Sequence, residues 1–358
     1  SVRVIAMHEP GCPTRQQFGP VTVIRPRYIW PDRLAVLRKA GGGLPAVWRA
    51  NPWARLLAAP FLLVHTLAVA RYAADCDIVH ANWTLSAAAA AVSQVWHRRP
   101  VVATLHGSDL TQATRVPLVT PATRAALAAC RRVIAVSGYL AERAARLGVP
   151  PARLVVVPDG VDVEAFRPAP GPREPWLVYV GALIEIKGVR HLLAALPDVL
   201  AGQPDLRLAV IGEGPQRAEL EALAARLGVG DRVQWLGPQP PEVVRAWMQR
   251  ARALVLPSLE EGLGVVLLEA LACGTPCVGT TAGGIPDVIT PDTGRLAPPA
   301  QPAALAAAIR DVLGDEARWA EMSAAARRRA VATFSWPAIS QRLLQIYHAA
   351  LAETGRGG

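Results

Sequence analysis

One stretch, from Leu256 to Ile289, constrains the fold of this chain more than any other. It consists of an apolar strand, an acidic loop with glycines, a short apolar helix, a second strand and a second glycine loop. In an open α/β sheet, this order places a loop and a helix N-terminus at the carboxyl end of a parallel strand, which is where ligands bind. The stretch therefore predicts both an α/β fold class and a ligand site.

Two carboxylates in this stretch, Glu261 and Glu269, stand eight residues apart, and a short loop between them opens the helix. The loop and the helix start comprise Gly262, Leu263, Gly264 and Val265. Backbone N–H groups there can approach an anion, and a carboxylate can accept hydrogen bonds from a diol such as a ribose. The pattern therefore fits a nucleotide that carries a sugar. Spacing alone leaves a second interpretation open, in which Glu269 is solvated and Glu261 only interacts with the helix dipole.

The composition limits the class of protein and its partners. A chain of 358 residues with 52% apolar and 18% charged residues is long enough for two α/β domains. Its net charge of +10 is compatible with nucleic acid, an anionic membrane surface or an anionic substrate. We expect no nucleic-acid partner, because the sequence has no compact basic run interleaved with aromatic residues. The five scattered cysteines have no metal-binding spacing and indicate a reducing cytosol.

Alternating strands and helices divide the chain into two Rossmann-like, doubly wound domains. Residues 1–165 form the first domain, and the proline-rich segment from Phe166 to Pro175 has the composition of a linker. Residues 176–335 form the second domain, and residues 336–358 form a final helix. His106 follows an apolar strand at 101–105 and precedes a glycine, so we expect it to face the ligand. A lone histidine in such a place is more often structural.

Four motifs, which occur along the chain in the family's order, resemble those of the retaining glycosyltransferases of family 4, over residues 75–335. They are the Glu-x7-Glu pair, Val180–Leu183 with Lys187 and Gly188 for a Gly-Arg-x4-Lys-Gly segment, Leu105–Asp109 for a catalytic-histidine loop, and Val157–Asp162 for a Val-Pro-Asn-Gly-Val-Asp turn. The resemblance implies a GT-B fold, with two Rossmann-like domains facing each other across a cleft and the final helix returning to the first domain.

The resemblance also implies a retaining hexosyltransferase that moves a sugar from a nucleotide-diphosphate sugar to a glycan or lipid-linked acceptor. Lys187 would neutralise the diphosphate, Glu269 would hold the ribose, Glu261 would hold a sugar hydroxyl, and His106 would approach the reacting carbon. The other expected donor-binding residues are Gly181, Gly212, Gly262, Leu263, Gly264 and Val265. No cofactor or metal is expected. The implied setting is cell-envelope polysaccharide or glycolipid synthesis, in the cytoplasm or peripherally on the inner face of the membrane.

Two residues depart from the family pattern. Ala182 stands where the family commonly has an arginine for the diphosphate, so another cation, such as Arg190 or Arg217, would be needed. Asp159 replaces an asparagine in a turn that tolerates both residues. These departures leave two other functions open: a GT-B sugar-nucleotide-binding protein with a decayed active site, and a GT-B enzyme of another reaction, such as epimerisation.

A membrane-contacting surface is a further expectation. Residues Arg27 to Arg71 interleave basic residues with Trp30, Trp48 and Trp53 beside an apolar helix, a pattern that fits the surface of an anionic membrane. The alternative is an ordinary helix of the outer layer of the sheet. No apolar stretch reaches the ~20 residues that a spanning helix needs.

The start of the chain also departs from the family. Val2–Ala6 leads to a second strand at Val21–Arg25 without a helix between them, so it resembles the family's second strand. We therefore expect the first strand, glycine loop and helix to be absent, and the activity of this form to be weak. In the alternative, Val2–Ala6 is the central strand, lies beside the strand at 101–105, and is followed by an active-site loop at Glu9–Gln17.

Overall fold

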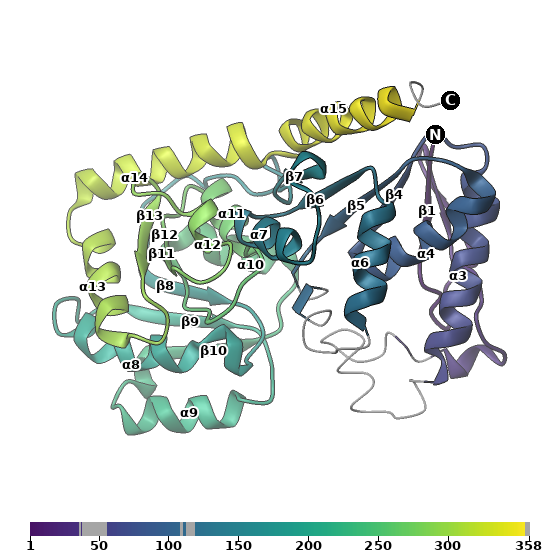
Figure 1. The fold of residues 1–358 in the computed structure, drawn as a ribbon. Coiled ribbons are helices and arrows are strands. Elements are labelled where there is room, and N and C mark those ends of the chain that lie inside the picture. Colours follow the sequence, from purple (N-terminus) through teal and green to yellow (C-terminus); the bar gives the residue numbers. More distant parts are fainter. Residues whose placement is uncertain (36, 38–55, 108–109, 112–118, 355–358) are drawn as a thin grey trace.

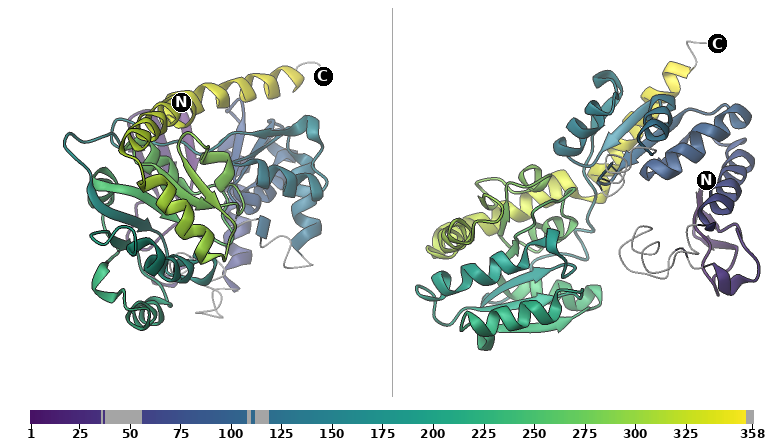
Figure 2. Two further views of the ribbon diagram at one scale, coloured as in Figure 1. Left: turned by 90° about the vertical axis from the view of Figure 1, so that its left-hand side faces the viewer. Right: turned by 60° about the horizontal axis from the view of Figure 1, so that its bottom comes forward.

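The computed structural model describes residues 1–35, 37, 56–107, 110–111 and 119–354. Two α/β bodies lie side by side, and a long helical segment runs along both of them (Figures 1 and 2). The predicted two-domain α/β class is confirmed. Trp48 and Trp53 of the expected membrane segment lie outside the described residues. No helix in the described part has the length and apolar character needed to cross a membrane.

The described part of the first body contains two sheets. The larger sheet is fully parallel and has the order β4 (Val79–Asn82), β5 (Val101–Leu105), β6 (Arg132–Ala135) and β7 (Leu154–Val156). Every residue of β5 is buried, which explains why this strand is a continuous apolar run in the sequence. Among its described residues, the α-helices of this body are α3 (Ala58–Ala73), α4 (Trp83–His97), α6 (Val119–Ala129) and α7 (Gly138–Arg146).

The smaller sheet has the order β1 (Val2–Ile5), β3 (Val21–Ile24) and β2 (Arg15–Phe18). Because β1 pairs with β3, and β5 pairs with β4 and β6, the alternative that placed residues 2–6 beside the strand at 101–105 is wrong. The expected loop at Glu9–Gln17 is also wrong in part, since Arg15–Phe18 pairs antiparallel with β3 as a hairpin. The expectation that a strand is missing before Ser1 stays a prediction.

The second body is one parallel sheet of six strands in the order β10-β9-β8-β11-β12-β13. In chain order this is the doubly wound pattern 3-2-1-4-5-6, so the order reverses between β8 and β11. The strands are β8 (Glu174–Val180), β9 (Arg207–Ile211), β10 (Val233–Gly237), β11 (Ala251–Leu256), β12 (Cys277–Thr280) and β13 (Gly294–Ala297). The helices are α8 (Val189–Leu200), α9 (Arg217–Arg226), α10 (Pro241–Arg250), α11 (Val265–Ala272), α12 (Ile285–Val288), α13 (Pro302–Leu313) and α14 (Glu316–Arg329).

The last helix, α15 (Trp336–Thr354), leaves the second body and packs on the first (Figures 1 and 2). It completes a separate core cluster whose members come from β5, β6, the end of β7 and α15: Val102, Ile134, Val157, Ile339, Ile346 and Ala350. The Tyr347 hydroxyl also lies 2.6 Å from Nδ1 of His80 on β4. The predicted return of the final helix to the first domain is therefore confirmed.

Candidate active site

The predicted site residues of the second body lie where its strand order reverses. The loop after β8 carries Gly181 and Lys187, and the loop after the neighbouring β11 carries Glu261 and Gly262. Both loops leave the carboxyl ends of adjacent parallel strands, the place where open α/β sheets bind ligands. The sequence pattern and the topology therefore point to the same edge of the sheet.

Lys187 and Glu261 form an ion pair there. The Lys187 Nζ lies 2.7 Å from Glu261 Oε2, and the Ser258 hydroxyl donates to the same oxygen at 3.3 Å. Both charged side chains are largely shielded, being 23% and 13% exposed. In this state the lysine is neutralised by protein, so an anionic ligand would compete with Glu261 for it.

Helix α11 begins directly beyond this pair. Gly264 caps it with a φ of +89°, in the left-handed region that glycine adopts without steric cost. The first N–H groups of a helix have no intrahelical acceptor and carry partial positive charge, so they favour an anion. Glu269 lies about one turn into α11, and burial raises the pKa of its carboxyl to about 7. No hydrogen bond to this carboxyl is found among the described residues.

His106 lies just beyond β5 in the first body. Its Nε2 is 3.0 Å from Asn82 Oδ1, and its Nδ1 is 3.5 Å from Asp159 Oδ1. The ring is thus flanked by the end of β4 and by the turn after β7. Sequence reasoning assigned no role to Asn82 and gave little weight to Asp159. Asn82 could have been found from its position at the end of a strand. Asp159 could not, because its contact with His106 joins residues that are distant in sequence.

The two bodies touch at this point. A Cβ added to Gly262 would lie only 2.6 Å from the His106 carbonyl oxygen, and one added to Gly107 would lie 3.2 Å from the Gly262 Cα. The Ser137 hydroxyl donates to the Gly262 carbonyl at 2.7 Å. The structure therefore brings the histidine loop together with the loop of Glu261, and glycines at both positions make this approach possible.

Further contacts across the same boundary hold the bodies together. The Glu260 carboxylate accepts a hydrogen bond from the Thr111 hydroxyl at 2.8 Å and lies 3.1 Å from Arg143 Nη1. The Gly138 N–H, at the start of α7, donates to Asp287 Oδ2 at 2.6 Å. Sequence reasoning missed these contacts because each joins two residues that are more than a hundred positions apart.

Gly181 and Gly212 pack against each other. A Cβ on Gly212 would lie 1.9 Å from the Gly181 carbonyl oxygen, and the φ of Gly212 is +137°. Close approach of the loops after β8 and β9 therefore explains the glycine at position 212 without a ligand. The role of both residues in donor binding stays a prediction.

Neither candidate for the missing cation is free. Arg190 lies 2.7 Å from Glu219, and Arg217 donates through Nε to Glu221 at 2.5 Å. At Ala182 itself, the backbone carbonyl accepts a hydrogen bond from the Tyr179 hydroxyl at 2.9 Å. Among the described residues, Lys187 and the amides at the start of α11 therefore remain as the positive groups beside Glu261.

Comparisons with known proteins agree with this geometry. Residues 2–165 match the family described as Glycosyltransferase Family 4, and residues 162–329 match Glycosyl transferases group 1. The glycogen synthase of Mycobacterium tuberculosis is 34% identical over 296 residues, covering 76% of this chain and 69% of that protein. D-inositol 3-phosphate glycosyltransferase 1 of Catenulispora acidiphila is 32% identical over 321 residues, covering 82% of this chain and 76% of that protein.

Solved structures share the fold. The sucrose-phosphate synthase of Thermosynechococcus elongatus superposes with a TM-score of 0.78 at 26% identity, covering 98% of this chain and 89% of that chain. Anabaena HepE in complex with UDP-glucose superposes with a TM-score of 0.68 at 22% identity, covering 87% and 90%. Glycosyltransferase family models match both halves of the chain, and relatives more than 30% identical span most of it. This protein therefore belongs to glycosyltransferase family 4 and has the GT-B fold.

Proposed function

We propose that the protein transfers a hexosyl group from a nucleotide-diphosphate sugar to a glycan or lipid-linked acceptor, with retention of the anomeric configuration. The observation that carries the proposal is the Lys187–Glu261 pair, 2.7 Å apart, in which the loop that carries Glu261 also touches the His106 loop of the other domain. A cation, a shielded carboxylate and a helix N-terminus converge there from adjacent strand ends. This set suits a sugar diphosphate, which has hydroxyls at one end and negative charge at the other.

Donor binding would exchange the partners of this ion pair. The diphosphate takes over Lys187, and the released Glu261 accepts a hydrogen bond from a sugar hydroxyl. Each group then keeps a charged hydrogen bond, so the exchange avoids an unpaired, shielded charge. Glu269 accepts hydrogen bonds from the ribose hydroxyls in its ionised form.

The bond that breaks joins the anomeric carbon of the sugar to a diphosphate oxygen, which keeps the electron pair. Lys187 and the amides near Gly264 and Val265 face this growing negative charge, where fixed dipoles are most effective. An acceptor hydroxyl attacks the same face of the sugar, and its proton passes to the departing diphosphate. His106 lies beside the reacting carbon, positioned by Asn82 and Asp159. We propose that these groups serve without a divalent metal, so treatment with EDTA leaves the rate unchanged.

The acceptor and the cellular location are inferred from relatives and from the cysteines. The relatives include a glycogen synthase, a D-inositol 3-phosphate glycosyltransferase and a phosphatidylinositol monomannoside mannosyltransferase of Mycolicibacterium smegmatis, so glycan and lipid-linked acceptors both occur among them. All five cysteines of this chain are free in the structure. Free thiols fit a reducing compartment, and we propose a cytoplasmic site of action.

The test is incubation of the full chain with UDP-, GDP- and ADP-sugars while free nucleotide diphosphate is measured. We expect one donor class to release nucleotide diphosphate slowly by hydrolysis when no acceptor is present and faster by sugar transfer when an acceptor is added, and proton NMR to find the product with the donor's anomeric configuration. Tight binding of a donor, without turnover of any donor in the panel, would contradict the enzymatic proposal and favour a sugar-nucleotide-binding protein. An inverted product would contradict retention alone.

A further inference from the structure

The side of the larger first-body sheet that α15 covers contains a row of connected polar side chains. The Tyr347 hydroxyl of α15 lies 2.6 Å from Nδ1 of His80 on β4, and Nε2 of the same ring lies 2.7 Å from the Thr104 hydroxyl on β5. The Tyr347 and His80 rings also meet edge to face, with 5.6 Å between their centroids. Both nitrogens of His80 therefore have a partner. We call Tyr347, His80 and Thr104 the polar bridge.

The polar bridge lies on the same face of the sheet as Asn82, the partner of His106. Side chains two residues apart on a strand point to the same face, so His80 and Asn82 share one face of β4. Thr104 belongs to that face as well, because it is paired with Asn82 in the register of β4 and β5. His106 follows Thr104 by two residues. The bridge therefore joins β4 to β5 one step before the Asn82 oxygen meets the His106 ring at 3.0 Å.

Burial determines the state of the bridge. The Thr104 side chain is buried, and burial, with a smaller contribution from His106, lowers the pKa of His80 to about 4. The His80 ring is therefore neutral at pH 7, with one nitrogen that donates and one that accepts. A hydroxyl can do either, so the bridge is satisfied without a buried charge. Loss of one hydroxyl would leave a shielded nitrogen without a partner, and the ring would turn to find another.

The end of β4 depends on such support. Asn82 is the N-cap residue of α4, yet in the described part of the chain its side chain makes no capping hydrogen bond. Its oxygen instead accepts from Nε2 of His106, and the next residue, Trp83, has a left-handed φ of +71°. A carbonyl oxygen only accepts, so this contact also fixes the hydrogen of the His106 ring on Nε2. The orientation of that ring therefore requires Asn82 to keep its place.

We propose that Tyr347, His80 and Thr104 are positioning residues, which hold the Asn82 oxygen and the His106 ring in the orientation that sugar transfer requires. The inference rests on the proposed function and adds to it the groups that support its histidine. The bridge clamps the side chains of β4 to those of β5 directly beneath this pair, and Tyr347 fixes the clamp from α15. The last helix of the chain thereby sets the geometry of a residue at the boundary of the two domains.

Two variants of Thr104 separate positioning from stability. Thr104→Val keeps the shape of the side chain and removes the hydroxyl, whereas Thr104→Ser keeps the hydroxyl and removes a methyl group. Both lose stability, the first through the unpaired His80 nitrogen and the second through lost apolar burial. We expect kcat to fall about tenfold in Thr104→Val and to stay close to that of the wild type in Thr104→Ser, with donor affinity unchanged in both.

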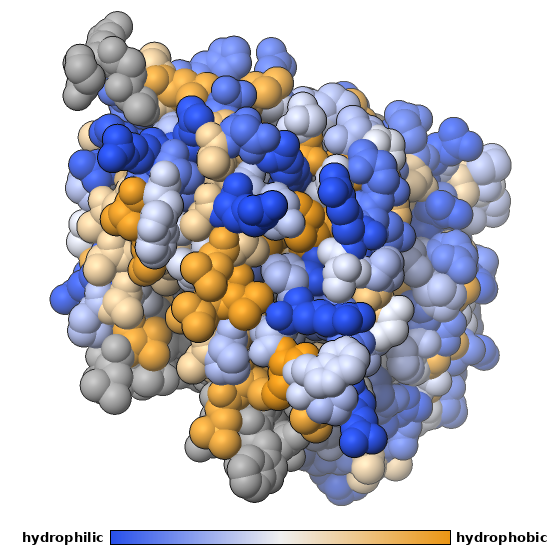
Figure 3. All heavy atoms as spheres, turned by 90° about the vertical axis from the view of Figure 1, so that its right-hand side faces the viewer, coloured by the Kyte–Doolittle hydropathy of each residue, from blue (hydrophilic) through white to orange (hydrophobic). Residues whose placement is uncertain are grey.

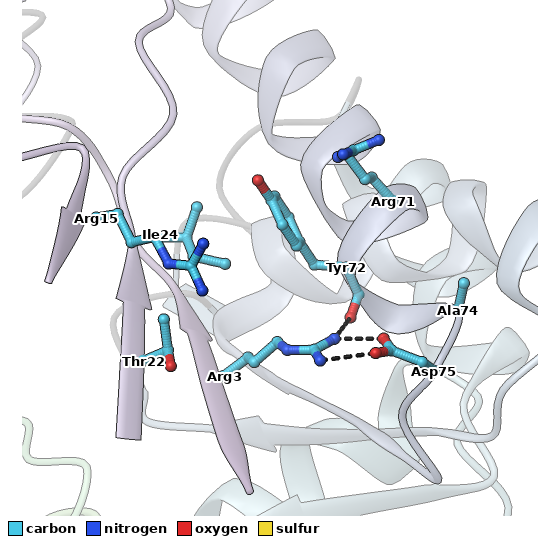
Figure 4. A pocket seen from close by; sticks show the side chains of 8 residues that line it. All are labelled: Arg3, Arg15, Thr22, Ile24, Arg71, Tyr72, Ala74 and Asp75. Atoms are coloured by element: carbon cyan, nitrogen blue, oxygen red, sulfur yellow. Dashed lines mark hydrogen bonds and ion pairs between the residues drawn. The ribbon is translucent and has the colours of Figure 1, made fainter. Parts of the chain in front are cut away.

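Tyr347→Phe removes a single oxygen from the other end of the bridge and should lower kcat to a similar extent. The matched control is Tyr72→Phe, on α3, which lies on the side of the molecule seen in Figure 3. The Tyr72 ring lines a cavity of about 390 Å³ between α3 and the smaller sheet (Figure 4). The carboxyl end of α3 leads to the start of β4, whereas His106 follows the end of β5. This control is therefore remote from His106, and its kcat should be that of the wild type.

The His106 ring supplies a readout that needs no turnover. In protein labelled with ¹⁵N-histidine, the ring signals of His106 are assigned by their loss in His106→Gln. At pH 8 the wild type, Thr104→Ser and Tyr72→Phe should carry the hydrogen on Nε2, and Thr104→Val and Tyr347→Phe should shift toward a mixture of both tautomers. If no donor in the panel is turned over, the proposed function fails, while this signal still decides whether the bridge positions the ring.

Four outcomes would overturn the proposal. The first is a wild-type kcat and an unchanged His106 signal in Thr104→Val and Tyr347→Phe. The second is an equal loss of kcat in Thr104→Ser and Thr104→Val, which would indicate packing alone. The third is an equal loss in Tyr72→Phe, and the fourth is a loss of donor affinity as large as the loss of kcat, which would assign the bridge to donor binding. Calorimetric donor titration and steady-state kinetics on the same samples distinguish these results.

Discussion

The carboxyl of Glu269 combines burial with the lack of a hydrogen-bond partner among the described residues. Burial raises its pKa to about 7 from the ordinary 4.5, so folding favours the neutral form. Below pH 4.5 the carboxyl is neutral in both the folded and unfolded states and has no effect on the pH dependence of stability. As pH rises through 4.5–7, the unfolded state loses its proton first, and stability falls.

We therefore predict that Glu269→Gln stabilises the protein relative to the wild type at pH 8 but not at pH 4. The difference reaches at most about 3.5 kcal/mol, from ~1.4 kcal/mol per pKa unit. Urea-unfolding midpoints of both proteins across this pH range measure it. Parallel pH profiles for the two proteins would show that the carboxylate is solvated or paired in the folded state.

Trp83 is a second residue whose backbone is informative. It follows Asn82, the partner of His106, and has a φ of +71° although it is not glycine. A left-handed conformation costs an L-residue roughly 1–2 kcal/mol. Trp83→Gly should therefore be more stable than Trp83→Ala by about 1 kcal/mol, although glycine is normally the less stable of the two in a helix. Urea unfolding of the two variants measures this difference. At Trp96, inside the same helix, the glycine variant should be less stable than the alanine variant. If alanine is the more stable at both positions, Trp83 is not strained.

At the scale of elements, β8 and β11 deliver Lys187 and Glu261 to one point, and α11 adds its N-terminus. We predict that Lys187→Ala weakens donor binding by roughly 1.5–3 kcal/mol, the value of a hydrogen bond to a charged group. Arg190→Gln is the control, since Arg190 is already paired with Glu219 on the surface. Calorimetric titration with the donor found in the panel is the measurement. Equal affinities for wild type and Lys187→Ala would remove the site assignment.

Elements with a strong local pattern were predictable from the sequence. The apolar run of β5, the glycine before α11 and the alternation of the second domain specify their own structure. The short strand β2 was missed, because Arg15–Phe18 has three polar residues and exists through its antiparallel pairing with β3. His106 could be placed from its position at a strand end. Its flanking residue Asp159 could not, since fifty-three positions separate the two and the fold brings them together.

At the scale of the whole molecule, the residue before Glu261 connects the domains. Glu260 is held by Thr111 and Arg143 of the first domain, so domain contact also fixes the loop that carries Glu261. We predict that Glu260→Gln lowers kcat about tenfold, corresponding to ~1.4 kcal/mol, while donor affinity stays unchanged, because only the closed arrangement is weakened. Steady-state kinetics and donor titration separate the two effects.

A matched pair of variants gives this prediction its control. The reversed pair Arg143→Glu/Glu260→Arg should recover part of the lost kcat, since opposite charges again meet across the boundary. Glu219→Gln removes a carboxylate from an ion pair within the second domain and should leave kcat unchanged. A loss of donor affinity in Glu260→Gln equal to its loss of kcat would assign Glu260 to the donor site instead.

The return of α15 to the first domain has a consequence for synthesis of the chain. Strands β5 and β6 leave the ribosome early, but the apolar side chains that cover Val102 and Ile134 belong to α15, at the far end of the sequence. The second domain can be completed in between, while the first waits with an open hydrophobic face, a state prone to aggregation. The domain that is made first is thus finished last, and a chain interrupted before Trp336 retains a complete second domain beside an incomplete first one.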